Sequence, residues 1–198
     1  AIVGGVTLGV LAAVYQNRSW DYVSVSVATL GVAVPNFVLA VFFIILFSFV
    51  IPLFPTGGWD SPSQWVLPTI TLALAPMGII ARFTRSSMIE VIRSDYVRTA
   101  RAKGLAEATV MFRHVLKNAL IPILTGVVVV IPLLFMGSLI AESFFGIPGL
   151  GSYTIDAIQA QDFAVVRSMV FIGSVLYILG LLLTDISYTF VDPRVRLN

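Results

Sequence analysis

The stretch Ser94-Asp95-Tyr96-Val97-Arg98-Thr99-Ala100-Arg101-Ala102-Lys103-Gly104 decides how this chain is organised. It lies in the middle of the one long polar segment, residues 82–117, which holds eight of the twelve Lys and Arg residues. Strongly apolar sequence flanks this segment on both sides. A segment with so many charges does not lie in lipid, and its apolar residues recur at helical spacing. We therefore expect a helical loop that leaves the membrane between two membrane-embedded halves.

The composition of the whole chain excludes a soluble domain. Hydrophobic residues make up 58% of the sequence and charged residues only 11%, and the mean hydropathy is +0.99. Such values are typical of an integral membrane protein. There are no cysteines, which excludes disulfides, thiolate nucleophiles and Cys-ligated metals. The sequence pI of about 9.2 comes from a few clustered bases, so we expect no nucleic-acid partner.

Long uncharged runs predict an all-α protein with five membrane spans. A span needs about 20 apolar residues, and the first run is shorter than this, as expected if the start of that span is missing. Prolines within the runs, such as Pro35, predict kinks. The predicted spans are residues 1–17, 23–51, 61–81, 118–141 and 168–190.

The distribution of the bases predicts which loops face the cytoplasm. If the five spans alternate, Arg18, the 82–117 segment and the C-terminal tail lie on one side, with eleven of the twelve Lys and Arg residues. Arg167 alone lies on the other side. The positive-inside rule makes the basic side cytoplasmic. A sixth, upstream span would then complete a single membrane domain, residues 1–198, with both ends in the cytoplasm.

The pattern of the 82–117 segment predicts two short helices joined at a glycine. Ser94 is placed to cap the first helix, on which Tyr96, Ala100 and Val97 form an apolar stripe. Gly104 is expected to end that helix in a left-handed conformation. The second amphipathic helix is predicted to begin near Ala106, and the residues expected on its apolar face are Ala108, Met111, Phe112 and Val115.

The helix pair permits two interpretations. Its small-residue face, predicted to contain Ala100, Ala102 and Ala106, suits a compact element that docks into the groove of a partner. An amphipathic pair lying on the anionic inner leaflet is an equally good interpretation of the pattern.

The sequence of the segment resembles a known family. The run from Tyr96 to Leu105, continued by residues 113–122, is similar to the cytoplasmic loop of ATP-binding-cassette (ABC) importer permeases of the dipeptide/oligopeptide branch. Aligned on Gly104, the chain departs from the wider family's loop, since His114 replaces an isoleucine and Leu116-Lys117 replaces Leu-Pro. Further resemblances are Pro35-Asn36-Phe37, Glu142-Ser143-Phe144-Phe145, Pro148-Gly149-Leu150-Gly151 and Asp192-Pro193-Arg194-Val195-Arg196.

The resemblance implies a type I ABC importer permease bundle in a prokaryotic cell membrane. Two homologous permeases would form the pore, two cytoplasmic ATPases would hydrolyse ATP with magnesium, and an external binding protein would deliver a peptide. The chain itself is expected to be no enzyme and to bind no cofactor, and it has no Gly-x-x-x-x-Gly-Lys-Ser/Thr phosphate loop. The residues implied in coupling to the ATPases are Tyr96, Val97, Arg98, Thr99, Ala100, Arg101, Ala102, Lys103, Gly104, Leu105 and Glu107.

Three residues are candidates for the translocation path. Asn36, after Pro35, is expected to face protein because an amide within a bilayer seeks polar partners. Glu142 could meet the amino terminus of a peptide at the outer mouth, although an interfacial carboxylate is an equal interpretation. A metal site built on His114, the one histidine, is not expected, because zinc usually takes three or four side chains.

Alternative functions remain open at this point. The same machinery could import a nickel chelate, glutathione or an oligosaccharide, and no motif separates these cargoes. An ion-driven secondary transporter would favour ionisable residues deep in the spans, which the uncharged runs lack. A purely structural anchor would leave the glycine-hinged basic segment without a purpose.

Overall fold

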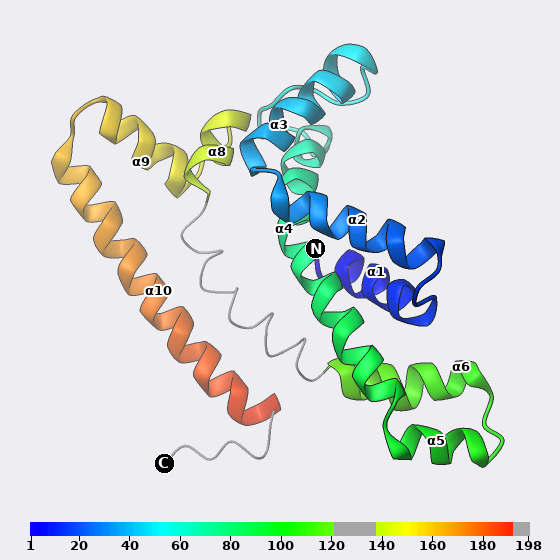
Figure 1. The fold of residues 1–198 in the computed structure, drawn as a ribbon. Helices are drawn as coiled ribbons and strands as arrows, with labels where there is room; N and C mark the ends of the chain where they lie inside the picture. The colour runs from blue at the N-terminus through cyan, green and yellow to red at the C-terminus, as the bar shows by residue number, and fades with distance from the viewer. Residues whose placement is uncertain (121–137, 192–198) are drawn as a thin grey trace. The chain divides into compact units, whose positions relative to one another are not determined.

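The computed structural model describes residues 1–120 and 138–191, and within these ranges the chain forms only helices and turns (Figure 1). Among the described residues, two helices are long and apolar enough to cross a membrane, namely α4 (Pro62–Ile92) and the Phe163–Leu183 part of α10 (Phe163–Val191). A third candidate is the broken pair formed by α2 (Ser19–Ala33) with α3 (Asn36–Ile44) and its extension η1 (Ile45–Val50). The predicted all-α membrane fold class is confirmed.

The other predicted spans have different outcomes. The first is a shorter apolar helix, α1 (Ile2–Val14). Most of the predicted span 118–141 lies outside the described residues. The third prediction ended at residue 81, whereas α4 runs on to Ile92 without a break. At about 1.5 Å per residue, 31 residues exceed the roughly 30 Å thickness of the hydrocarbon core, so α4 can carry the chain out of the membrane.

Pro35 breaks a helix where a kink was expected. The helix α2 ends at Ala33, and Pro35 is the N-cap of α3, with φ −57° and ψ 139°. Proline has no N–H to donate and biases the preceding residue away from helical angles, which accounts for the end of α2 just before it. The prediction of one kinked helix across residues 23–51 is therefore wrong.

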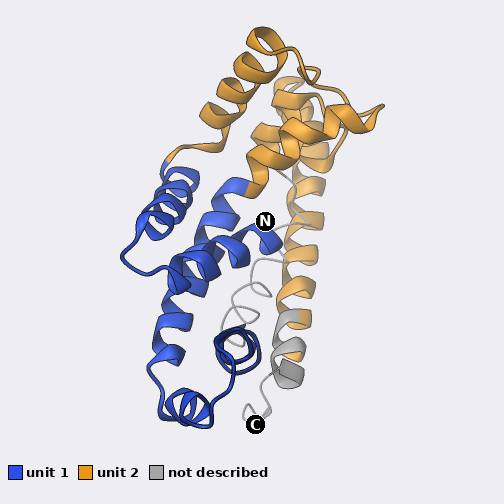
Figure 2. Cartoon of the chain, turned by 90° about the vertical axis from the view of Figure 1, so that its right-hand side faces the viewer, with its two compact units in different colours: residues 1–33, 74–128, 188–198 blue, residues 34–73, 129–187 orange. Residues whose placement is uncertain are grey.

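The chain falls into two compact units (Figure 2). Among the described residues, unit 1 contains 1–33, 74–120 and 188–191, and unit 2 contains 34–73 and 138–187. The remaining helices are α5 (Asp95–Ala102), α6 (Glu107–Thr109) with its extension η2 (Val110–Leu116), α8 (Leu139–Phe145) and α9 (Leu150–Gln159).

In unit 1, glycines allow α1 and α2 to approach α4 closely. A Cβ on Gly5 would lie 2.8 Å from the carbonyl oxygen of Met77, and one on Gly9 would lie 2.6 Å from that of Ala81. A Cβ on Gly31 of α2 would lie 2.6 Å from the carbonyl oxygen of Leu74. Small residues that bring backbones together are a common way to pack helices in lipid, where burial of apolar side chains gives little driving force.

Unit 1 also contains the core that holds the polar segment. Met88 of α4 is fully buried against Val97 of α5 and Val110 and Val115 of η2. Ala13 of α1 belongs to the same cluster. The two short helices α5 and α6–η2 are therefore packed onto the end of α4.

Unit 2 is built around Phe145, which is 1% exposed. Ala40 of α3 and Leu67 of α4 are buried with it, and Phe43, Phe47 and Phe54 pack against them. The main-chain N–H of Gly58 donates to the carbonyl of Phe145 over 2.8 Å. This core places α8 beside α3 in unit 2.

Candidate docking segment and apolar cavity

The helix α5 begins as predicted, but Ser94 does not cap it. Ser94 occupies the N-cap position with extended backbone angles, yet its hydroxyl donates backwards to the carbonyl of Val91 over 2.6 Å. Asp95 lies in the first turn, where a negative charge is favourable, and forms an exposed ion pair with Arg98 at 3.0 Å. The expected capping bond is thus replaced by a bond that closes the end of α4.

The buried face of α5 differs from the predicted stripe by one residue. Val97 is 0% exposed and Ala100 is 5% exposed, whereas Tyr96 is 45% exposed. Residues three apart lie on one face of a helix, so Val97 and Ala100 face the core together. Ala102 and Ala106 are exposed, so the predicted face shared by Ala100, Ala102 and Ala106 is not formed.

The conformation predicted for Gly104 is confirmed. Its φ is +76°, in the left-handed region that suits glycine, and its N–H donates to the carbonyl of Arg101 over 2.9 Å. A Cβ built on Gly104 would meet nothing within 4 Å. The space beside this glycine is therefore open in the chain alone.

An ion pair closes the turn around Gly104. Arg101 donates to both carboxylate oxygens of Glu107, from Nε over 3.1 Å and from an Nη over 2.6 Å. The two side chains are 40% and 60% exposed. The hydrogen bonds from Arg101 lower the pKa of Glu107, and the same bonds raise the pKa of Arg101. Arg101 thus has a partner within the chain, which the sequence analysis did not anticipate.

The second helix of the segment changes from α6 to the π-helix η2 at Val110. The i→i+5 bonds of a π-helix bring residues five apart toward one face, and Val110 and Val115 are both fully buried. Phe112 is 66% exposed, and Ala108 is exposed as well. The predicted apolar face is therefore correct for Met111 and Val115, which pack in the core, and wrong for Phe112 and Ala108.

The outward surface of the segment combines apolar and basic side chains. Tyr96, Leu105 and Phe112 are exposed by 45%, 41% and 66%. The neighbouring bases Arg98 and Lys103 are exposed too. We define this surface as the docking turn: α5, Gly104 and α6–η2. Its chemistry suits contact with another protein that has apolar and acidic groups.

A cavity of about 370 Å³ lies between α3 and α8 in unit 2. Asn36 at the start of α3 is one of its lining residues, and Pro35 immediately precedes it. The rest of the lining is mostly apolar and consists of Phe37, Ala40, Ser138, Leu139, Ile140, Ala141 and Phe144. A mostly apolar cavity with few polar groups has the character of a ligand site.

Glu142 lies in α8, behind this lining. Its carboxylate accepts hydrogen bonds from the main-chain N–H groups of Ser138, Gly151 and Ser152, over 2.9, 2.7 and 3.1 Å. The prediction that this carboxylate meets an amino terminus is not tested by these bonds and stays a prediction. These bonds tie the side chain to the main chain at the starts of α8 and α9.

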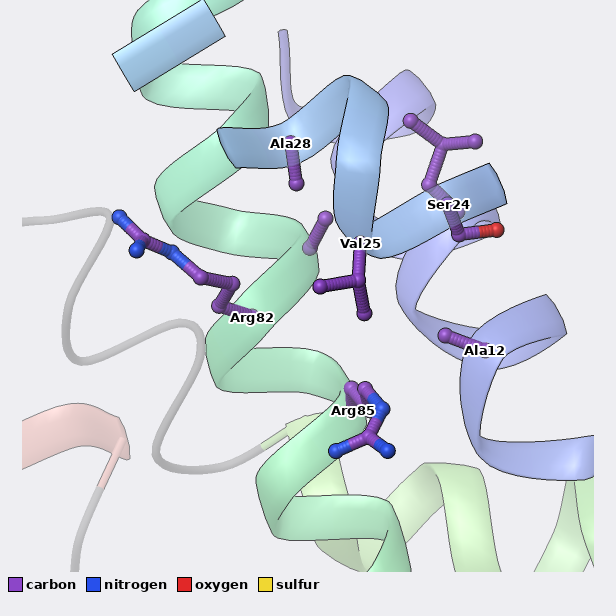
Figure 3. A pocket seen from close by; sticks show the side chains of 8 residues that line it. Ala12, Ser24, Val25, Ala28, Arg82 and Arg85 are labelled. Atoms are coloured by element: carbon purple, nitrogen blue, oxygen red, sulfur yellow. The ribbon is translucent and has the colours of Figure 1, made fainter. Parts of the chain in front are cut away.

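The sequence analysis missed an ion pair between α2 and α4. Asp21, 3% exposed, receives bonds from Nε and an Nη of Arg85 over 2.7 and 2.8 Å, and the N–H of Asn17 donates to it over 2.8 Å. A small cavity of about 10 Å³ beside the pair is lined by Ala12, Ser24, Val25 and Arg85, among others (Figure 3). The separation of 64 residues left no sequence signal for this pairing.

These features define a helical membrane protein with an exposed, glycine-hinged docking turn and an apolar cavity in a separate unit. A profile of the family "Binding-protein-dependent transport system inner membrane component" matches residues 5–197. The chain belongs to this family.

Relatives of known name agree with this membership. The chain is 43% identical over 198 residues to the dipeptide transport system permease protein DppB of Bacillus subtilis, and 41% identical over 201 residues to DppB of Lactococcus lactis. It is 37% identical over 196 residues to the glutathione transport system permease protein GsiC of Escherichia coli K12. These matches cover 99–100% of the chain, which spans 64–66% of the length of the relatives.

Proposed function

We propose that the chain is part of the pore-forming permease subunit of an ATP-driven ABC importer that takes up di- and oligopeptides. The observation that carries this proposal is the docking turn, whose central glycine is left-handed and has open space beside it. The family membership and the dipeptide permeases among the relatives support it. The peptide is the proposed cargo because those relatives have the higher identities.

The proposal assigns three kinds of protein partner. Two ABC ATPase subunits would contact the docking turn, with its coupling residues 96–105 and Glu107. A homologous second permease would complete the pore, and an external binding protein would deliver the cargo. ATP and magnesium would bind to the ATPases and not to this chain. ATP-driven closure of the ATPases would move the docking turn, and the core at Met88 would pass the movement to α4 as a rigid-body shift.

The proposed sidedness follows the positive-inside rule, with the docking turn and the C-terminus in the cytoplasm. Two contacts support the way the loops are paired. The loop at Gly58 bonds to Phe145, and both belong to the side predicted to be external. The turn at Asn17–Asp21 bonds to Arg85, and both belong to the side predicted to be cytoplasmic.

The proposed translocation path includes Pro35, Asn36 and Glu142. The cavity supports this assignment for Asn36, which lines it, whereas Pro35 and Glu142 are not among its lining residues. Replacing Asn36 by Ala is expected to change uptake or its selectivity in a normally assembled complex. Unchanged uptake and selectivity would remove Asn36 from the path.

Glutathione is the second candidate cargo. It is a small peptide-like molecule of three residues, and the GsiC relatives are permease proteins of glutathione transport systems. The test is uptake by the full-length subunit assembled with its partners in proteoliposomes. We expect ATP-dependent accumulation of a labelled dipeptide that excess glutathione does not inhibit. Inhibition by glutathione, with glutathione itself accumulating, would favour the second cargo, and no ATP-dependent uptake of either would contradict the proposed function.

A further inference from the structure

The turn between α8 and α9 is closed by bonds that use almost every polar group in it. Gly146 has φ +65°, and the N–H of Ile147 donates to the carbonyl of Glu142 over 2.8 Å, as in the Schellman motif that ends many helices. The hydroxyl of Ser152 accepts from the N–H of Gly149 over 3.0 Å and lies 2.9 Å from the carbonyl of Ile147. The turn is therefore ordered by its own main chain.

The carboxylate of Glu142 lies at the centre of this turn. One oxygen accepts from the N–H of Ser138 at the start of α8, and the other accepts from Gly151 and Ser152 in the first turn of α9. A carboxylate at the N-terminus of a helix is stabilised by free N–H groups and by the helix dipole. One side chain thus joins the starts of two successive helices.

Two glycines leave room for this carboxylate. A Cβ on Gly151 would lie 2.7 Å from one carboxylate oxygen and 2.8 Å from the nitrogen of Leu139, and a Cβ on Gly149 would clash with the same oxygen. Real Cβ atoms do not come this close to other heavy atoms, so a larger residue would force the carboxylate, and at Gly151 also the main chain at Leu139, to shift. We call Glu142, Gly149, Gly151 and Ser152 the clasp.

The clasp fixes one wall of the cavity beside Asn36. Ser138 to Ala141 line that cavity, and the N–H of Ser138 is held by Glu142. With seven residues, α8 is too short to be stable by itself in solution, because helix formation has a costly nucleus. Phe145 anchors its far end in the core of unit 2, so the clasp is the bond set that anchors its near end.

We propose that Glu142 is a positioning residue, which holds the start of α8 where it walls the cavity beside Asn36. This inference rests on the proposed function only for the identity of the cargo. Both oxygens are already engaged by N–H donors, so loosening the clasp weakens uptake of all cargoes alike. A Glu142 that binds the amino terminus of a cargo would instead discriminate between free and blocked amino termini.

The test compares three variants in the full-length, assembled importer. Glu142→Ala removes the acceptor, and Gly151→Ala keeps the carboxylate but adds a Cβ that crowds it and the main chain at Leu139. Asp156→Asn is the matched control, because this exposed residue of α9 loses a charge without touching the clasp. We expect main-chain hydrogen exchange at residues 138, 151 and 152 to become at least about tenfold faster in both clasp variants and unchanged in the control.

Uptake kinetics provide the second measurement. For a dipeptide and its N-acetylated form, we expect KM to rise by the same factor in Glu142→Ala and in Gly151→Ala. Loss confined to the free amino terminus in Glu142→Ala, with Gly151→Ala normal, would overturn the proposal. Unchanged exchange in both clasp variants would overturn it too, whether or not the importer accepts peptides. Absence of peptide uptake by the unaltered importer would contradict the proposed function and leave the exchange result to decide the clasp.

Discussion

Two turns in this chain join short helices through glycine, and they are built in opposite ways. At the docking turn, a Cβ on Gly104 would meet open space, and the closing carboxylate of Glu107 has an exposed arginine as its partner. At the clasp, a Cβ on Gly151 would meet main chain within 3 Å, and the carboxylate of Glu142 accepts three main-chain N–H groups. The clasp is complete within the chain, whereas the space beside the docking turn is open.

Glycine serves two different purposes at these turns. Gly104 is required for its backbone angle, since left-handed φ is costly for other residues. Gly151 is required for its lack of a side chain. Gly104 lies at an exposed turn, whereas Gly151 is packed against Glu142 and Leu139. The effects of substitutions at the two glycines should therefore be separable by experiment.

The largest loss of stability is expected from breaking the Arg85–Asp21 ion pair, which anchors α4, the helix that leads into the docking turn. Arg85→Ala leaves the buried carboxylate of Asp21 without its charged partner, which typically costs about 3–5 kcal/mol. Thermal unfolding of the purified full-length permease should show a large loss of stability. Arg82→Ala is the control, because Arg82 is exposed on the same helix. Equal losses in the two variants would contradict the anchoring role.

The next effect tests the two glycines directly. Gly151→Val should destabilise the permease itself by roughly 3 kcal/mol, through overpacking and lost hydrogen bonds. Gly104→Val should cost only about 1 kcal/mol of backbone strain and leave the subunit inserted, while the ATPases are retained poorly on purification. Unfolding temperature and the amount of ATPase recovered are the two measurements. Wild-type uptake and ATPase retention in Gly104→Val would favour a docking turn that lies on the lipid surface.

A smaller effect is expected from the ion pair across the docking turn. If Arg101 acts through Glu107, then Arg101→Glu and Glu107→Arg should each reduce ATP-driven uptake. The double exchange should restore most of that uptake. Exposed pairs contribute at most about 1 kcal/mol, so uptake should change by severalfold only. The exposed pair Asp95–Arg98 is the control exchange. Failure of the double exchange to restore coupling would indicate that Arg101 meets an acidic group on a partner.

The smallest effect concerns pH. The bonds from Arg101 lower the pKa of Glu107 below its usual 4.5, so this pair contributes fully above pH 4.5 and is lost as pH falls through the lowered pKa. The contribution of this pair to subunit stability should therefore stay constant between pH 5 and 8. The stability of the unaltered subunit should decline slightly below pH 4.5, and Glu107→Gln should remove this decline. A decline centred near neutral pH that Glu107→Gln abolishes would contradict this assignment.

Much of the fold could be predicted because hydropathy and the distribution of bases act over long stretches. The membrane class, the polar segment and the left-handed Gly104 all follow from local sequence. The exposure of Phe112 could not be predicted, because a π-helix changes the period of the buried face and has no distinct sequence signal. The pairing of Asp21 with Arg85 and the clasp at Glu142 depend on tertiary contacts, which periodicity does not report.

Accessibility of Leu105 in the docking turn tests the central claim most directly. Residues 1–198 contain no cysteine, so Leu105→Cys adds one thiol to this part of the permease, at a position that is 41% exposed. Its reaction with a membrane-impermeant maleimide is measured in inverted membrane vesicles, before and after the ATPases are stripped away and added back. We predict slow labelling with the ATPases bound and at least about tenfold faster labelling without them, as expected for a site buried in an interface. The same labelling rate with and without the ATPases would contradict the docking role.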